Sequence, residues 1–74
     1  MMDERDVEII LALAENNMNE SETSRALYMH RNTVVYRIRK IKRLTGLDPT
    51  NFHDLCKLIQ RVQERGRRKE DYYG

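Results

Sequence analysis

Residues 20–46 read ESETSRALYMHRNTVVYRIRKIKRLTG, in which a short helical pattern is followed by a turn and a longer helical pattern. The short pattern has small or apolar residues on one side, namely Thr23, Ser24 and Leu27. Gly46 ends the longer pattern, because glycine readily adopts the left-handed conformation found where helices stop. The stretch predicts helices over about 20–27 and 31–44, packed closely against each other.

The longer of these two helices has two chemically different faces. Its apolar face has residues at helical spacing, namely Val34, Ile38, Ile41 and Thr45. The opposite face is polar and basic, with Asn32, Tyr36, Lys40 and Arg43, and with Thr33 and Arg39 on its flanks. We expect the apolar face to enter the core and the basic face to stay in solvent.

Two further helices are predicted, over about 4–16 and 51–65. The first has its apolar residues at Val7, Ile10, Leu11 and Ala14, and the last has them at Phe52, Leu55, Ile59 and Val62. Cys56 is expected to fill a place in the core, because a single cysteine packs as a small hydrophobe. The fold class is therefore all-α, a small four-helix domain over 1–66 followed by a flexible basic and polar tail at 67–74.

Ile9 and Leu13 lie on roughly the opposite side of the first helix from its other apolar residues. This helix is thus apolar around more of its circumference than one contact requires. Either the two residues pack under the last helix, or they meet a second subunit and form a homodimer contact.

Composition argues against several classes of protein. A chain of 74 residues with 39% hydrophobic residues has little left over to line a catalytic pocket, so we expect no enzyme, no cofactor and no small-molecule ligand in this chain. One Cys and two distant His residues form no metal pattern. The longest apolar stretch has six residues, against the ~20 needed to cross a bilayer, and the acidic N-terminus lacks an export signal. We expect a cytoplasmic protein that does not enter a membrane.

The charges are distributed unevenly although the net charge is only +2. Residues 1–22 contain seven acidic residues and one Arg, whereas residues 31–43 contain six Lys or Arg and no acid. Such asymmetry indicates a polyanionic partner, and double-stranded DNA fits a short helix, a turn and a longer basic helix.

Residues at different positions along the longer, basic helix are expected to make different contacts with DNA. Its first turn carries Arg31, Asn32 and Thr33, which suit guanine, adenine and thymine respectively. His30 is expected to cap the helix or contact a phosphate, and Tyr36 to contact a base edge or a phosphate. The remaining cations are expected to anchor phosphates, namely Arg37, Arg39, Lys40, Lys42 and Arg43.

The residues from Leu27 to Ile38, LYMHRNTVVYRI, followed by Leu44 to Asp48, LTGLD, resemble the C-terminal helix-turn-helix domain of the PucR family of bacterial regulators. The resemblance covers about residues 7–64 and implies a four-helix fold akin to the nucleoid protein Fis. It implies a DNA-facing set of His30, Arg31, Thr33, Tyr36 and Arg37. Ser24 stands where the family usually has Ala, and family members normally carry a sensor region ahead of this domain, so a fragment or a stand-alone relative is expected.

Three functions remain open on the sequence. The first is a sequence-specific reader domain of a transcription regulator, acting as one half of a two-fold dimer. The second is an architectural DNA binder of low sequence preference. The third is a protein-interaction module, in which Ile9 and Leu13 mark the functional face.

Overall fold

The computed structural model describes the backbone of residues 2–73 and the side chains of residues 2–64. Within this part the chain forms four helices and no strand: α1 (Glu4–Glu15), α2 (Glu20–Ala26), α3 (Arg31–Thr45) and α4 (Phe52–Tyr73). The all-α fold class is therefore confirmed, and the bounds of the first three helices agree with the sequence patterns to within one residue.

The end of α4 differs from the prediction. The helix continues to Tyr73 and passes through Gly66, where we expected it to stop. Glycine lowers helix propensity by only about 1 kcal/mol, which does not force a helix to end. The side chains of the predicted tail at 67–74 lie outside the described residues, and a domain boundary at residue 66 stays a prediction.

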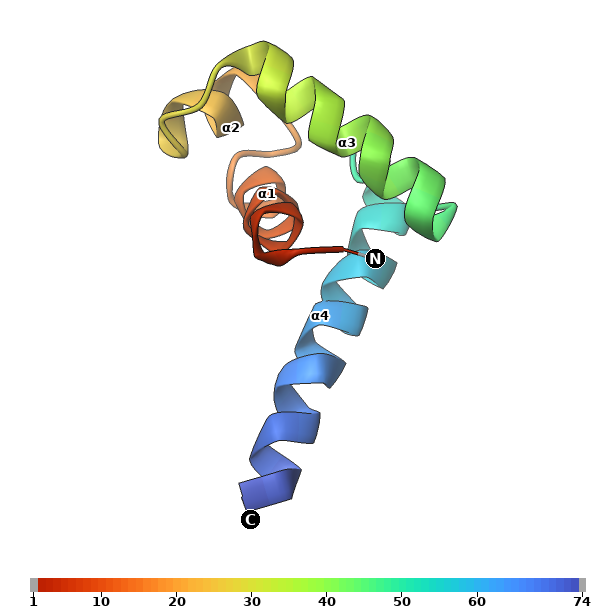
Figure 1. Ribbon diagram of the computed structural model, residues 1–74. Coiled ribbons are helices and arrows are strands. Elements are labelled where there is room, and N and C mark those ends of the chain that lie inside the picture. Colours follow the sequence, from red (N-terminus) through yellow and green to blue (C-terminus); the bar gives the residue numbers. More distant parts are fainter. Residues whose placement is uncertain (1, 74) are drawn as a thin grey trace.

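Helix α1 occupies the centre of the fold and packs against each of the other three helices. Helices α2 and α3 lie together on one side of it, and α4 runs away from α3 toward the opposite end of the molecule (Figure 1). One face of α3 is thus covered by the rest of the fold, and its opposite face is turned outward.

The core joins α1, α3 and α4 through eight buried apolar side chains: Ile9, Ile10, Leu13, Val34, Ile38, Ile41, Leu55 and Leu58. The apolar face predicted for α3 is confirmed. The buried side of α1 is different from the predicted one, since Leu11 is 40% exposed and Ala14 is also exposed, whereas Ile9 and Leu13 are 0% exposed.

The burial of Ile9 and Leu13 decides between the two alternatives for these residues. Both belong to the core, so the packing alternative holds. The dimer contact predicted at Ile9 and Leu13 is corrected, because a side chain with no exposed area cannot meet a second subunit in this fold. The spacing of apolar residues in α1 did not separate core from surface positions, because α1 is contacted by three other helices. Ile9, Ile10 and Leu13 are therefore all buried.

Helix α4 also differs from its predicted face at two positions. Phe52 is 62% exposed and Cys56 is exposed, so neither is a core residue. The buried stripe begins at Leu55 and includes Leu58, which was not among the predicted core residues. Cys56 follows Leu55 by one position and is therefore rotated by about 100° away from that stripe.

Side chains cap three of the four helices. Asp3 caps α1, Asn19 caps α2 by accepting from the backbone N–H of Glu22 at 2.9 Å, and Asn51 accepts from Asp54 at the start of α4. Gly46 ends α3 as predicted, with a left-handed φ of 74°. These caps fix the helix ends and therefore the lengths of the connecting turns.

Candidate nucleic-acid interface

The turn between α2 and α3 is anchored on both of its sides. Leu27 and Met29 pack against the core, and the backbone N–H of Met29 donates to the carbonyl of Ser24 at 2.9 Å. Thr23 and Ser24 are buried, as predicted for a close helix contact. The turn therefore fixes the angle at which α3 leaves α2.

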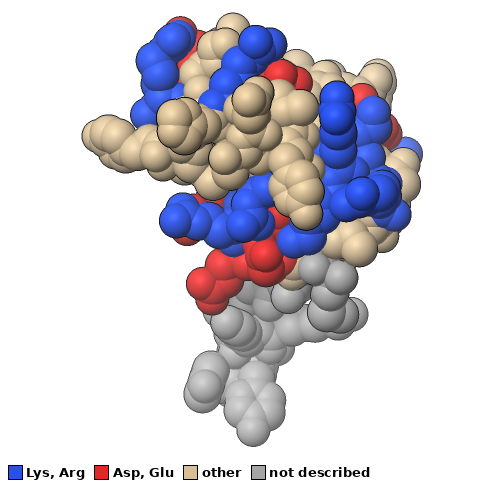
Figure 2. Space-filling model, turned by 45° about the horizontal axis from the view of Figure 1, so that its top comes forward, with Lys and Arg blue, Asp and Glu red and all other residues tan. Residues whose placement is uncertain are grey.

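Because Val34, Ile38 and Ile41 hold α3 on the core, its opposite face is presented to solvent. Eight of the ten residues predicted to contact DNA are exposed, namely His30, Arg31, Asn32, Thr33, Tyr36, Arg39, Lys42 and Arg43. Figure 2 shows Lys and Arg side chains gathered on this side of the molecule around a patch of uncharged ones. The fold thus brings these residues onto one surface, which we call the α3 face.

The N-terminal end of α3 is open. His30 occupies the cap position but its side chain makes no capping hydrogen bond, in contrast to Asp3, Asn19 and Asn51 at the other helices. A shallow hollow lies over this end and is lined by residues of the first turn, His30, Arg31, Asn32 and Thr33. The predicted capping role of His30 is therefore not seen in its side chain.

The other two predicted residues, Arg37 and Lys40, are engaged by acidic side chains from α1. The Arg37 Nη1 lies 3.1 Å from Asp3 Oδ1 and 3.2 Å from Asp6 Oδ1. The Lys40 Nζ lies 3.2 Å from Asp3 Oδ2 and 3.0 Å from Asp6 Oδ2. We call these four residues the α1–α3 ion-pair cluster.

The same two carboxylates also cap α1. Asp3 accepts from the backbone N–H of Asp6 at 3.0 Å, and Asp6 accepts from the backbone N–H of Asp3 at 3.1 Å. Asp6 is 0% exposed, whereas the side chains of Arg37 and Lys40 are each 24% exposed. The cluster thus ties the start of α1 to the middle of α3, and most of the area of both cations is covered.

The pKa values of three cluster members shift in the direction that keeps them charged. The backbone N–H of Asp6, and then the ammonium of Lys40, hold the pKa of Asp3 far below its ordinary value. Hydrogen bonds to Asp6 and Asp3 raise the pKa of Lys40. Desolvation lowers the pKa of Arg37, but the bonds to the same two carboxylates outweigh it and raise that pKa.

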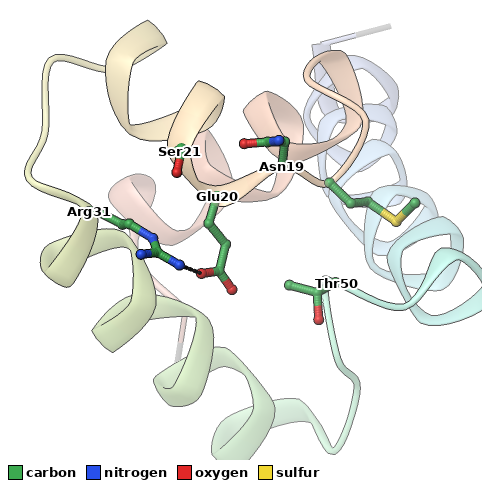
Figure 3. A pocket seen from close by; sticks show the side chains of 6 residues that line it. Asn19, Glu20, Ser21, Arg31 and Thr50 are labelled. Carbon is green, nitrogen blue, oxygen red and sulfur yellow. Dashed lines mark ion pairs between the residues drawn. The ribbon is translucent and has the colours of Figure 1, made fainter.

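Two weaker ion pairs lie at the ends of α3. Arg31 Nη2 is 3.8 Å from Glu20 Oε2, at the edge of a hollow lined also by Met18, Asn19, Ser21 and Thr50 (Figure 3). Lys42 Nζ is 3.7 Å from Asp48 Oδ2, and its side chain is 52% exposed. Both cations keep more than half of their side-chain area in solvent, so these contacts leave them accessible.

Three acidic partners of the basic residues, Asp3, Asp6 and Glu20, were not predicted from the sequence. The sequence carries a signal for the positions of the first two. A capping residue followed three positions later by an acid is typical of a capping box, and this pattern places both carboxylates at the start of α1. Arg37 and Lys40 are also three apart and so share one side of α3. Their pairing across two helices depends on how α1 crosses α3, which no sequence spacing specifies.

The described residues contain no group of three or more His, Cys, Asp or Glu side chains that could hold a metal ion. Over the same part of the chain, every helix is too short or too polar to span a bilayer.

Comparison with known proteins agrees with this geometry. The model of the PucR C-terminal helix-turn-helix domain matches residues 7–59. The carbohydrate diacid regulator of Escherichia coli strain K12 is 43% identical over 54 residues, which are 73% of this chain and 14% of the regulator. No solved structure matches the chain. With a family match over most of its length, the chain belongs to the PucR family, as its C-terminal helix-turn-helix domain.

Proposed function

We propose that this domain binds double-stranded DNA sequence-specifically, with α3 in the major groove, as the reader of a bacterial transcription regulator. One observation carries the proposal: α3 is held on the core by Val34, Ile38 and Ile41, and its opposite face is mostly exposed and carries no acidic residue of α3 itself. Membership of a helix-turn-helix regulator family supports the same role, which is one of binding and not of catalysis.

The first turn of α3 is the proposed site of base reading. Arg31, Asn32 and Thr33 are all exposed there, and residues at the N-terminal end of a recognition helix lie deepest in the groove. Arg suits guanine, Asn suits adenine, and the Thr methyl group suits the methyl group of thymine. His30 and Tyr36 flank these residues and complete the proposed contact set.

Three exposed cations, Arg39, Lys42 and Arg43, are the main proposed phosphate contacts. Arg39 and Arg43 form no ion pair with any side chain among residues 2–64. Arg37 and Lys40 stay in the proposed interface, but their carboxylate partners already neutralise them. We therefore propose that these two mainly hold α3 at its angle and contribute less to DNA affinity.

The domain is proposed to act as one half of a two-fold dimer in a cytoplasmic regulator. One recognition helix reads only a few base pairs, and helix-turn-helix proteins place two such helices about 34 Å apart on the DNA. Because Ile9 and Leu13 are buried, we propose that the two copies of the dimer meet through other residues. The chain spans only 14% of the diacid regulator, and the effector is proposed to bind outside this domain.

A binding assay over a salt series tests the proposal. The chain is titrated against a selected high-affinity duplex and several unrelated duplexes, because phosphate contacts weaken with salt while base contacts preserve sequence preference. A preferred sequence at high salt is expected. Equal loss on all duplexes would indicate an architectural binder, and no binding at low salt would indicate a protein-interaction module.

A matched pair of substitutions shows which surface is used. Arg43→Ala removes an exposed cation from the α3 face and should make the negative slope of log affinity against log salt shallower by about 0.9. Arg61→Ala removes an exposed cation from α4 and should leave the slope unchanged. Equal effects of both substitutions would contradict the assignment of the interface to α3.

A further inference from the structure

Tyr28 combines two features that the fold does not require. It is 98% exposed, more than any other large hydrophobic residue among those described. Its φ is 55°, in the left-handed region that bulky residues rarely adopt. Glycine or asparagine would satisfy this position in the turn at lower cost.

Met18 shows how a similar conformation is usually offset. Its φ is 63°, but its side chain is partly buried and packs against the core, so contacts within the protein compensate for the strain. The ring of Tyr28 gains almost no such contact, since 98% of the residue is in solvent. A bulky residue kept in an unfavourable backbone conformation, although its own side chain gains no contact within the fold, points to a task outside the fold.

The backbone around Tyr28 is held firmly, so the ring has a defined place. Its N–H donates to the carbonyl of Arg25 at 3.2 Å, and its neighbours Leu27 and Met29 are both packed on the core. The residue thus projects outward between two anchors, two positions before His30 at the start of α3. This is the end of α3 proposed to enter the groove.

The surrounding charge favours a polyanion as the partner of this ring. Residues 23–47 contain seven Lys or Arg and no acidic residue, and Tyr28 lies within that stretch. A phenol hydroxyl can donate a hydrogen bond to a phosphate oxygen, and Tyr is among the side chains that contact the DNA backbone in this way. In helix-turn-helix complexes the recognition helix lies in the major groove and the helix before it crosses the DNA backbone, so the turn between them lies beside a sugar-phosphate strand.

We infer that Tyr28 is a DNA-backbone contact, whose hydroxyl donates to a phosphate at the edge of the groove that α3 enters. This inference rests on the proposed function and adds to it a neutral contact in the turn, outside the basic face of α3. Because every DNA sequence has the same phosphates, this contact raises affinity for all sequences alike. Because the hydroxyl is uncharged, the contact releases no counterion.

Three variants of the chain test the inference against several short duplexes of unrelated sequence over a salt series. Tyr28→Phe removes only the hydroxyl, and Tyr28→Asn removes the ring while keeping a residue that tolerates the left-handed conformation. Phe52→Ala removes an exposed aromatic from α4 as the control. Thermal unfolding of each variant is measured in parallel.

Both Tyr28 variants should bind about tenfold more weakly, by the same factor on every duplex and with the salt slope unchanged. The melting temperature should stay the same for Tyr28→Phe and rise for Tyr28→Asn, and Phe52→Ala should bind like the parent. Parental affinity in Tyr28→Phe, or a lower melting temperature in Tyr28→Asn, would overturn the inference. Failure of the parent chain to bind any duplex would overturn the proposed function, and this inference with it.

Discussion

Replacing Asp6 by Asn removes one negative charge from the α1–α3 ion-pair cluster while keeping the shape of the side chain. The Asp6 carboxylate is 0% exposed and accepts from the Asp3 N–H at 3.1 Å, in addition to its ion pairs with Arg37 and Lys40. Removing one partner of a fully buried ion pair costs about 3–5 kcal/mol. Since both cations keep 24% of their area in water, a smaller loss of about 2 kcal/mol is expected.

For a domain of this size, that loss lowers the melting temperature by about 8–16 °C. Circular dichroism at neutral pH measures the melting temperature, and urea titration measures the free energy of unfolding. Glu8→Gln is the matched control, because Glu8 is an acid of α1 whose side chain is 51% exposed and forms an ion pair with Arg5. The control should change stability by less than about 0.5 kcal/mol. Equal melting temperatures for Asp6→Asn and Glu8→Gln would refute the structural role of the cluster.

Three further predictions concern stability and DNA recognition. The pKa of Asp3 is lowered in the folded chain, so ionised Asp3 stabilises the fold fully above its ordinary pKa of 3.8, and this stabilisation is lost as the pH falls below that value. Urea titrations that show no loss of unfolding free energy below pH 3.8 would contradict this. Thr23→Val should raise the free energy of unfolding by about 1 kcal/mol, because the buried Thr23 hydroxyl has no hydrogen-bond partner among the described residues; destabilisation in the same titration would show that the hydroxyl is satisfied. Arg31→Ala should reduce discrimination between a selected and a scrambled duplex by about 1–3 kcal/mol, whereas Lys42→Ala should weaken both equally; the reverse pattern would mean that α3 lies in the groove in the opposite direction.

The helices of this domain could be predicted well from sequence because their caps and apolar spacing are local signals. Asn19 and Gly46 mark helix ends, and the apolar face of α3 at Val34, Ile38 and Ile41 is buried as its spacing indicated. The exposure of most of the basic face of α3 followed from the same periodicity, because burying one side of a helix turns the other side outward.

The contacts between helices could not be predicted in the same way. Ile9 lies in the core and Leu11 does not, because α1 is covered on more than one side, and its exposed side is set by the three helices around it. The engagement of Arg37 and Lys40 by Asp6 likewise depends on where α1 crosses α3. Helical periodicity identifies faces, whereas the partner of each face is decided by the tertiary arrangement.

The α3 face, together with the turn before it, is the surface that we propose meets DNA. Amide chemical-shift mapping tests this claim directly, with the isotope-labelled chain titrated with a mixed-sequence duplex at low salt. The largest changes are expected from Tyr28 to Arg43, with small changes in α4 beyond Leu58. Changes centred on α4, or spread evenly over all four helices, would contradict the claim that α3 reads the DNA.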